Sequence, residues 1–193
     1  MPSSNRDKRK PYSTYPSLHP SVVELLKPSG LAMAFHPIDT DEIPNKTRLA
    51  NTNIMGSFAC YNESCPSPGW ASKMVAITIR MYRKDGNSHS PSGKGKGKRN
   101  QPGLYHVRVY HQRCKNCNFL SRPKLDDSYA ERVAYWLKKW HGIEVERPAY
   151  GRKGKAPHAK KLCEGCKAGI CQYSKRAGDV SDFVSDSLLR QRT

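Results

Sequence analysis

The sequence predicts an α+β fold in which a small antiparallel β-sheet packs against one amphipathic helix, flanked by flexible ends. Three observations predict it: two segments with apolar residues at every second position, one segment with helical periodicity, and three groups of closely spaced cysteines. The 193 residues suffice for one domain, but only 36% are hydrophobic, and 14 are glycine and 14 proline. We therefore expect a compact centre that leaves the ends of the chain outside it.

Residues 1–53 are predicted to form a largely flexible arm. They hold seven of the 14 prolines and none of the cysteines. One segment is an exception, because Ser21 and Glu24 have the spacing of a capping box and Pro28 stops the helix after at most two turns. We expect this short helix to act as an apolar clip on the core.

Two segments, 73–82 and 104–112, predict a pair of antiparallel strands. In each of them apolar and β-branched residues occupy every second position, which is the period of a strand with one buried face. The segment between them, 86–102, is rich in Gly, Ser and Lys, and it is expected to be a basic flexible loop.

The alternation also assigns the two faces of this sheet. One face carries Val75, Ile77, Ile79, Val107 and Val109, and we expect it to pack against the helix. The opposite face is expected to be open, and it carries Arg80, Tyr82, Arg108 and Tyr110.

A helix is predicted over residues 129–140. Ser128 and Glu131 have capping-box spacing, and apolar residues recur at helical intervals at Tyr129, Val133, Trp136, Leu137 and Trp140. Gly142 stands where a left-handed cap would end the helix. The last residues, 173–193, are predicted to be a tail of mixed charge.

The charge of the chain indicates an acidic partner. The formal net charge is +18 at pH 7, which suits nucleic acid, an anionic membrane surface or an acidic protein. The sequence has no run of about 18 apolar residues and no apolar segment behind its basic N-terminus. We therefore expect neither a transmembrane segment nor a secretory signal. We expect the protein in the cytoplasm, the nucleus or both. Nucleophile, base and orienting group do not occur in a recognisable arrangement, so neither an enzyme nor a small-molecule substrate is expected.

The seven cysteines fall into three groups: Cys60-x4-Cys65, Cys114-x2-Cys117 and Cys163-x2-Cys166-x4-Cys171. An odd count in a chain expected in the reducing cytosol argues against a disulfide framework. Two-residue spacing lets both thiolates of a tight turn point at one ion, so metal binding is the leading explanation.

Two closed zinc sites need eight donors, one more than the cysteines supply. His158 lies five residues before Cys163 and completes the set, with His111 and His141 as alternatives. Because a hairpin brings its outer ends together, the predicted sites are Cys60, Cys65, Cys114 and Cys117, as in a zinc ribbon, and His158, Cys163, Cys166 and Cys171, as a second zinc knuckle. Interleaved pairing of the groups remains an alternative. We expect two structural Zn²⁺ ions, whose removal unfolds residues 56–171.

Five short motifs occur in order along the chain: GSFAC at 56–60, WASK at 70–73, YHQRCKNC at 110–117, ERVAY at 131–135 and LCEGCKAGIC at 162–171. Together they resemble the 3CxxC-type zinc finger family, which includes the vertebrate receptor-transporting proteins, the zygote-arrest proteins and many fungal members. The chain is similar to the fungal type, and the resemblance covers about residues 54–172, which we take as the zinc-binding domain. Four residues instead of two separate the first cysteine pair, which departs from the family pattern.

The resemblance implies zinc binding and, as in several animal members, RNA binding through this domain. The first hypothesis is therefore a zinc-stabilised module that binds nucleic acid, RNA before DNA. On the open sheet face, Tyr82 and Tyr110 are expected to stack bases while Arg80 and Arg108 hold phosphate, unless that face is merely solvated. Further phosphate contacts are expected from Lys94, Lys96, Lys98, Arg99, Arg152, Lys153, Lys155, Lys160 and Lys161. The second hypothesis, implied by the receptor-transporting branch, is a protein-interaction adaptor or a trafficking chaperone for a client protein.

Overall fold

One β-sheet organises the part of the chain that the computed structural model describes, residues 9–42, 47–82, 102–148 and 158–175. Neighbouring antiparallel strands follow the order β1 (Tyr12–Ser13), β5 (Gly103–Tyr110), β4 (Trp70–Tyr82), β3 (Arg48–Phe58) and β8 (Lys124–Leu125). The short β2 (Met33–Phe35) pairs with β5 in parallel. A two-stranded ribbon, β6 (Gln112–Arg113) and β7 (Leu120–Ser121), stands beside this sheet. The predicted α+β class with an antiparallel sheet is confirmed.

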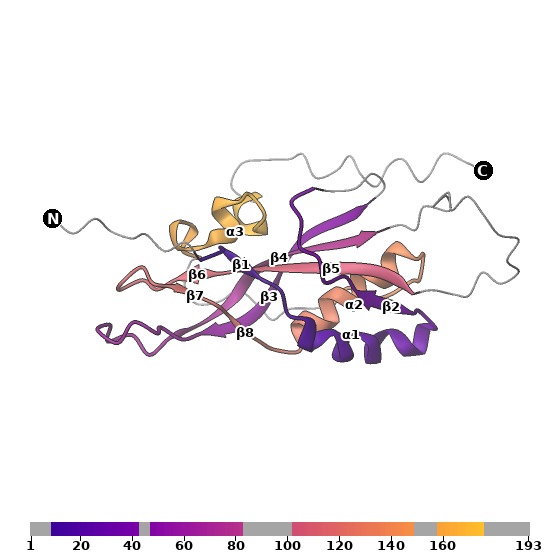
Figure 1. Cartoon of the computed structure of the whole chain (residues 1–193), viewed down its shortest axis with the longest axis horizontal. Helices are drawn as coiled ribbons and strands as arrows, with labels where there is room; N and C mark the ends of the chain where they lie inside the picture. The colour runs from indigo at the N-terminus through magenta and orange to yellow at the C-terminus, as the bar shows by residue number, and fades with distance from the viewer. Residues whose placement is uncertain (1–8, 43–46, 83–101, 149–157, 176–193) are drawn as a thin grey trace, which may run out of the picture.

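The two predicted strands pair as expected, with Ile77 opposite Val109 and Ile79 opposite Val107. Their apolar side chains share one face and are fully buried. Two helices cover that face, α1 (His19–Leu26) and α2 (Ser128–Trp140), and Figure 1 shows them together on one side of the long strands. The predicted packing of the sheet against α2 is therefore confirmed, and α1 adds a second helix to the layer.

Helix α2 ends where the sequence predicts but begins differently. Gly142 has φ +74°, and the amides of Gly142 and Ile143 donate to the carbonyls of Lys139 and Lys138, which closes the helix end. At the other end, the carboxylate of Asp126 accepts the Ser128 amide at 3.0 Å. The Ser128 hydroxyl instead accepts the amide of Met55 on β3 at 2.8 Å, so the predicted capping box is wrong and its serine ties the helix to the sheet.

The prediction of a largely flexible arm is wrong for residues 9–42. β1 and β2 pair with β5, and Val22 and Leu26 of α1 are fully buried in the core, as expected of an apolar clip. Ser21 lies inside α1, so the first predicted capping box is also wrong. The proline content does not indicate flexibility here, because several prolines lie in the first turns of α1 and of the flanking 3₁₀ turns Pro16–Leu18 and Lys27–Ser29. At these positions the missing N–H costs no hydrogen bond.

Strand β3 is the largest element without a sequence prediction. It starts at Arg48, before the expected domain start, and pairs with β4 along almost its whole length. Its apolar face is interrupted by Thr52, and its other face carries Asn51 and Asn53, residue types that are uncommon in strands. Asn53 is used at a metal centre, and the side-chain oxygen of Asn51 accepts the Thr78 hydroxyl on β4.

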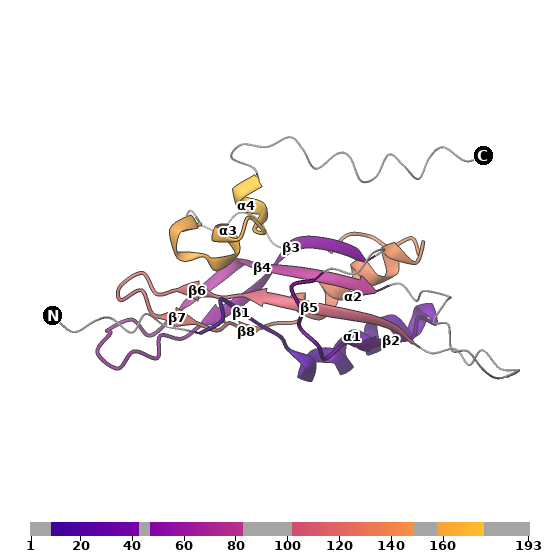
Figure 2. The ribbon, with the colours of Figure 1, turned by 45° about the horizontal axis from the view of Figure 1, so that its top comes forward.

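The second face of the sheet is covered as well. The short helices α3 (Glu164–Lys167) and α4 (Gln172–Lys175), preceded by the 3₁₀ turn Lys160–Leu162, lie across the sheet from α1 and α2, and Figure 2 shows them above β4. Ala76 and Tyr110 of the sheet pack with Cys163 and Cys171 there. The predicted loop 86–102, except for residue 102, and the tail beyond residue 175 lie outside the described residues. No helix in the described part of the chain is long and apolar enough to span a membrane.

Candidate metal centres

Four cysteines converge at one end of the sheet. Cys60 and Cys65 lie in the loop between β3 and β4, and Cys114 and Cys117 lie in the turn between β6 and β7. The sulfur of Cys60 is 3.4 Å from that of Cys117, and the sulfur of Cys65 is 3.8 Å from that of Cys114. Four sulfurs bound to one zinc at about 2.3 Å in a tetrahedron lie about 3.8 Å apart, so the spacing fits the ion.

The β6–β7 turn prepares its thiols for a metal. The Cys114 amide donates to the Phe119 carbonyl and the Asn118 amide to the Cys114 carbonyl, both at 2.9 Å, and Asn118 takes a left-handed conformation with φ +61°. Burial by itself raises the pKa of Cys114, but hydrogen bonds from the backbone amides of Cys117 and Asn116 lower it to about 6. The turn therefore favours the thiolate, which is the form that binds zinc.

The second centre is built within residues 158–171, by His158, Cys163, Cys166 and Cys171. The Nε2 atom of His158 is 3.3 Å from the Cys166 sulfur and 3.7 Å from the Cys171 sulfur. In both centres every pair of ligand atoms lies within 4.8 Å, so one site of four cysteines and one site of three cysteines and a histidine fit two zinc ions. The predicted sequential pairing is found.

The two alternative histidines have other partners. The Nε2 atom of His111 lies 2.8 Å from the Ser13 hydroxyl, and burial lowers the pKa of His111 to about 4, so its ring is neutral near pH 7. The Nδ1 atom of His141 lies 2.7 Å from the Leu137 carbonyl oxygen. The first contact is with β1 and the second is with α2. Neither histidine belongs to the two clusters of metal-ligand type found among the described residues.

Strand β3 contributes a contact to the second centre that the sequence did not reveal. The side-chain amide of Asn53 donates to the Cys171 sulfur at 3.3 Å, and its oxygen accepts the Gln172 amide at 3.0 Å. A hydrogen bond from Cys163 is the main cause that lowers the pKa of Cys171, to about 3, and the bonds from His158 and Asn53 lower it further. Asn53 therefore stabilises a ligand thiolate from outside the cysteine motif.

Further contacts fasten the second centre to the sheet and to the β6–β7 ribbon. The Glu164 amide donates to the His111 carbonyl at 3.1 Å, and Cys163 forms a β-bridge with Gln112. The Glu164 carboxylate is paired with Arg113 at 2.6 Å and Lys167 at 2.7 Å. Gly165 lies so close to β4 that a Cβ on it would be 2.3 Å from that of Ala76.

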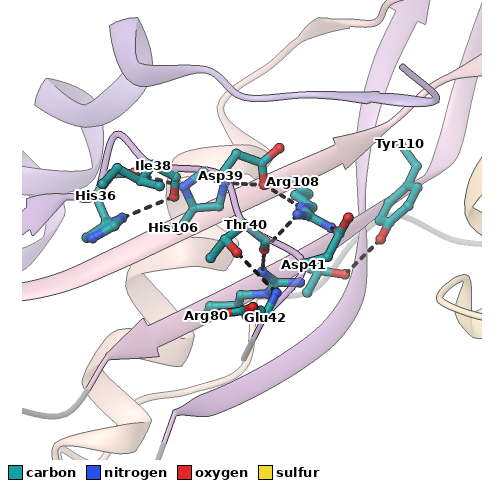
Figure 3. A network of polar contacts seen from close by, with 11 residues as sticks. His36, Ile38, Asp39, Thr40, Asp41, Glu42, Arg80, His106, Arg108 and Tyr110 are labelled. Atoms are coloured by element: carbon teal, nitrogen blue, oxygen red, sulfur yellow. Dashed lines mark hydrogen bonds and ion pairs between the residues drawn. The ribbon is translucent and has the colours of Figure 1, made fainter. Parts of the chain in front are cut away.

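The sheet face predicted to be open is covered, so that prediction is wrong. Arg80, Arg108 and Tyr110 are no more than 7% exposed, and Tyr82 is half-buried against the ring of His36. The second zinc centre covers Tyr110. The covering segment, residues 36–42, lies over the two arginines, as Figure 3 shows.

The covering segment matches the arginines in charge. Arg108 donates to Asp39 at 2.5 Å, to Asp41 at 2.7 Å and to the Thr40 carbonyl at 2.8 Å, and Arg80 donates to the same carbonyl at 2.6 Å. These bonds engage the guanidinium groups that the sequence predicts to hold phosphate. Of the other predicted phosphate contacts, Lys160 and Lys161 are exposed. Lys94, Lys96, Lys98, Arg99, Arg152, Lys153 and Lys155 lie outside the described residues.

Comparison with known proteins agrees with the two centres. A family model for a 3CxxC-type zinc ribbon, described as a zinc-binding domain, matches residues 53–169. That range contains seven of the eight ligands, and the eighth, Cys171, follows two residues later. No curated protein and no solved structure gives a significant match to the chain.

Proposed function

Since the chain belongs to the 3CxxC-type zinc-ribbon family of zinc-binding domains, we propose that it is a zinc-stabilised module that binds nucleic acid, RNA before DNA. Both candidate centres have four protein ligands, which fill a tetrahedral zinc ion and leave no open position for a substrate or a water molecule. This supports a structural use of zinc and a protein without catalytic activity. The site of action we propose is the cytoplasm, the nucleus or both.

The exposed cations around the second zinc centre carry this proposal. Lys160, Lys161 and Lys167 are exposed there. The single acidic residue between 158 and 175, Glu164, is buried and already paired with Arg113 and Lys167. The outer surface of this centre therefore offers an excess of positive charge, as phosphate binding requires.

Two further basic segments are included in the proposal on their sequence alone. Arg152, Lys153 and Lys155 directly precede the second centre in the chain, and Lys94, Lys96, Lys98 and Arg99 belong to the predicted loop. The motifs that resemble the zygote-arrest proteins favour RNA over DNA, and a fungal-type member is the relationship that we infer within the family.

The competing hypothesis, an adaptor or trafficking chaperone, calls for a contiguous apolar surface. Within the described residues, the most exposed large hydrophobic side chains belong to five separate segments: Leu25, Ile38, Leu49, Tyr61 and Leu104. The exposed cations of the second centre are the observation that favours nucleic acid over an apolar client.

The test measures binding of a labelled single-stranded RNA to the zinc-loaded full chain at several salt concentrations. We expect affinity to fall steeply with salt. The variant K160A/K161A should lower the slope of log K against log salt by about 1.4, since each of the two lost phosphate contacts with a single strand contributes about 0.7. K27A/K139A removes the same charge from the 3₁₀ turn after α1 and from α2, and it is the control. Binding that does not depend on salt, or equal effects of both variants, would contradict the proposal.

A further inference from the structure

A cavity of about 580 Å³ opens beside the first zinc centre. Arg9 and Lys10 of the N-terminal segment around β1 form part of its wall. The rest of the wall includes Tyr61 of the Cys60–Cys65 loop, His111, and the two residues that flank β7, Phe119 and Arg122. Figure 2 shows β1 beside β5 and close to β6 and β7 at this end of the molecule. The volume lies in the range of about 300–1,000 Å³ that small-ligand sites occupy.

Hydrogen bonds and ring contacts hold the wall in place. The His111 amide donates to the Pro11 carbonyl at 2.9 Å, which continues the pairing of β1 with β5. Arg122 donates to the Thr14 carbonyl at 3.2 Å, and its guanidinium lies 4.3 Å from the centre of the Tyr15 ring. The Arg9 guanidinium lies 4.3 Å above the Phe119 ring. The two arginines are thus oriented before any ligand arrives, which lowers the entropic cost of binding.

The wall carries a net positive charge. Arg9, Lys10 and Arg122 are exposed cations. The carboxylate in the wall, Asp39, has a side chain that is 15% exposed, and it is paired with Arg108, which also binds Asp41. An anion that enters the cavity therefore meets three cations and one acid that is already paired, an arrangement that selects phosphate or carboxylate.

Aromatic rings stand next to these cations. Tyr61 is 72% exposed, although a large apolar ring gains free energy from burial. It lies in the four-residue loop that separates Cys60 from Cys65. Phe119 follows the second cysteine pair, half-buried under Arg9. A flat ring attached to a phosphate would find both a stacking surface and a cation here.

We propose that this cavity holds one unpaired nucleotide of a single-stranded RNA, with its phosphate on Arg9, Lys10 and Arg122 and its base stacked on Tyr61. The inference rests on the proposed function and gives it a second contact region, separate from Lys160 and Lys161. An acidic peptide would satisfy the cations equally well, but it would leave the exposed ring of Tyr61 without a partner.

The experiment uses zinc-loaded full-length protein and a fluorescent octauridine RNA. Tyr61→Ala should weaken binding about tenfold or more, the usual effect of removing one stacked base, while Tyr61→Phe keeps the ring and the affinity. Arg122→Gln should reduce the salt slope by about 0.7. Tyr135→Ala, on α2 and outside the cavity, is the matched control, and each variant should still carry two zinc ions.

The outcomes separate this inference from the proposed function. If Tyr61→Ala binds the RNA as tightly as the natural chain, the nucleotide site is overturned while nucleic-acid binding through Lys160 and Lys161 stands. If the natural chain does not bind the RNA at any salt concentration, both proposals fall. If hexaglutamate displaces the RNA at a similar concentration from the natural chain and from Tyr61→Ala, the cavity is a site for acidic peptides. The proposal that it holds a nucleotide is then overturned.

Discussion

Asn53 joins the sheet to the second zinc centre through a single side chain. Replacing it with alanine removes the donor to the Cys171 sulfur and the acceptor for the Gln172 amide. We expect zinc affinity at this centre to fall about 10- to 100-fold, the usual effect of losing a partner of a metal ligand, with the first centre unchanged. Competition with a chromogenic chelator measures both.

Asn51→Ala supplies the control for this substitution. Asn51 lies on the same face of β3, but its side chain bonds to Thr78 and to neither zinc centre. Equal losses in the two variants would show that the effect comes from damage to the strand, not from the contact with Cys171.

His111 makes stability depend on pH. Burial lowers its pKa from 6.5 to about 4, so the unfolded chain binds a proton between these values that the folded chain does not. The free energy of unfolding should therefore fall as pH falls, with about 2 kcal/mol of the loss between pH 7 and pH 5 due to this residue.

His111→Gln isolates that contribution, because glutamine keeps a polar atom near Ser13 and does not titrate. Denaturation of both proteins at pH 7 and pH 5 with excess zinc gives the comparison, since protonation of the metal ligands is common to both. The same pH dependence in the two proteins would mean that His111 does not carry the effect.

At the scale of elements, the contact of α3 with β4 depends on the missing side chain of Gly165. A Cβ there would meet that of Ala76 at 2.3 Å, so Gly165→Ala should push α3 away from the sheet. We expect the free energy of unfolding to fall by about 1–3 kcal/mol, the range for an overpacked contact, and metal analysis after dialysis to find less zinc at the second centre.

The double variant G165A/A76G tests the reason for this loss. It removes the methyl group that the new one would meet, and it should regain zinc content relative to G165A alone, although glycine in a strand costs about 1 kcal/mol. Failure of the second substitution to restore zinc would place the damage within α3 instead of at its contact with β4.

Elements whose own sequence carries their periodicity were predictable, and elements defined by distant partners were not. β4, β5 and α2 follow from the spacing of Ile77, Val107 and Val133, and the ligands of the metal centres follow from their tight spacing. β3 did not follow from any such spacing, since one of its residues, Asn53, bonds Cys171, which lies 118 residues later in the chain. The cover over Arg108 was equally hidden, because Asp39 lies 69 residues before it and no local pattern joins them.

At the scale of the whole molecule, the apolar core and the zinc centres are separate. The main cluster of buried hydrophobic residues joins α1, α2 and the sheet without any zinc ligand, while the second centre has a small cluster of its own. The sequence led us to expect zinc removal to unfold residues 56–171. From the fold we instead expect local unfolding, because the main core buries its apolar surface without the metal.

Hydrogen exchange with and without a strong chelator measures the extent of this unfolding. Metal analysis beforehand should give two zinc ions per chain. Exchange should accelerate at the ligand loops, residues 59–69, 111–121 and 158–173, and change little in α2 and the centre of β4. A uniform acceleration that includes α1 and α2 would show that zinc supports the whole fold.

The pairing of β1 with β5 also constrains when the molecule can be completed during its synthesis. The hydrogen bond between Ser13 and His111 joins residues 98 positions apart, so β1 leaves the ribosome well before β5, the strand with which it pairs. At about 5–20 residues per second, the N-terminal segment waits about 5–20 seconds for its partner. During that interval Val22 and Leu26 cannot pack against the completed core, so a chaperone that binds short apolar helices could bind them. Docking of the N-terminus is then a late step of folding, and a fluorescent label near residue 9 would report it.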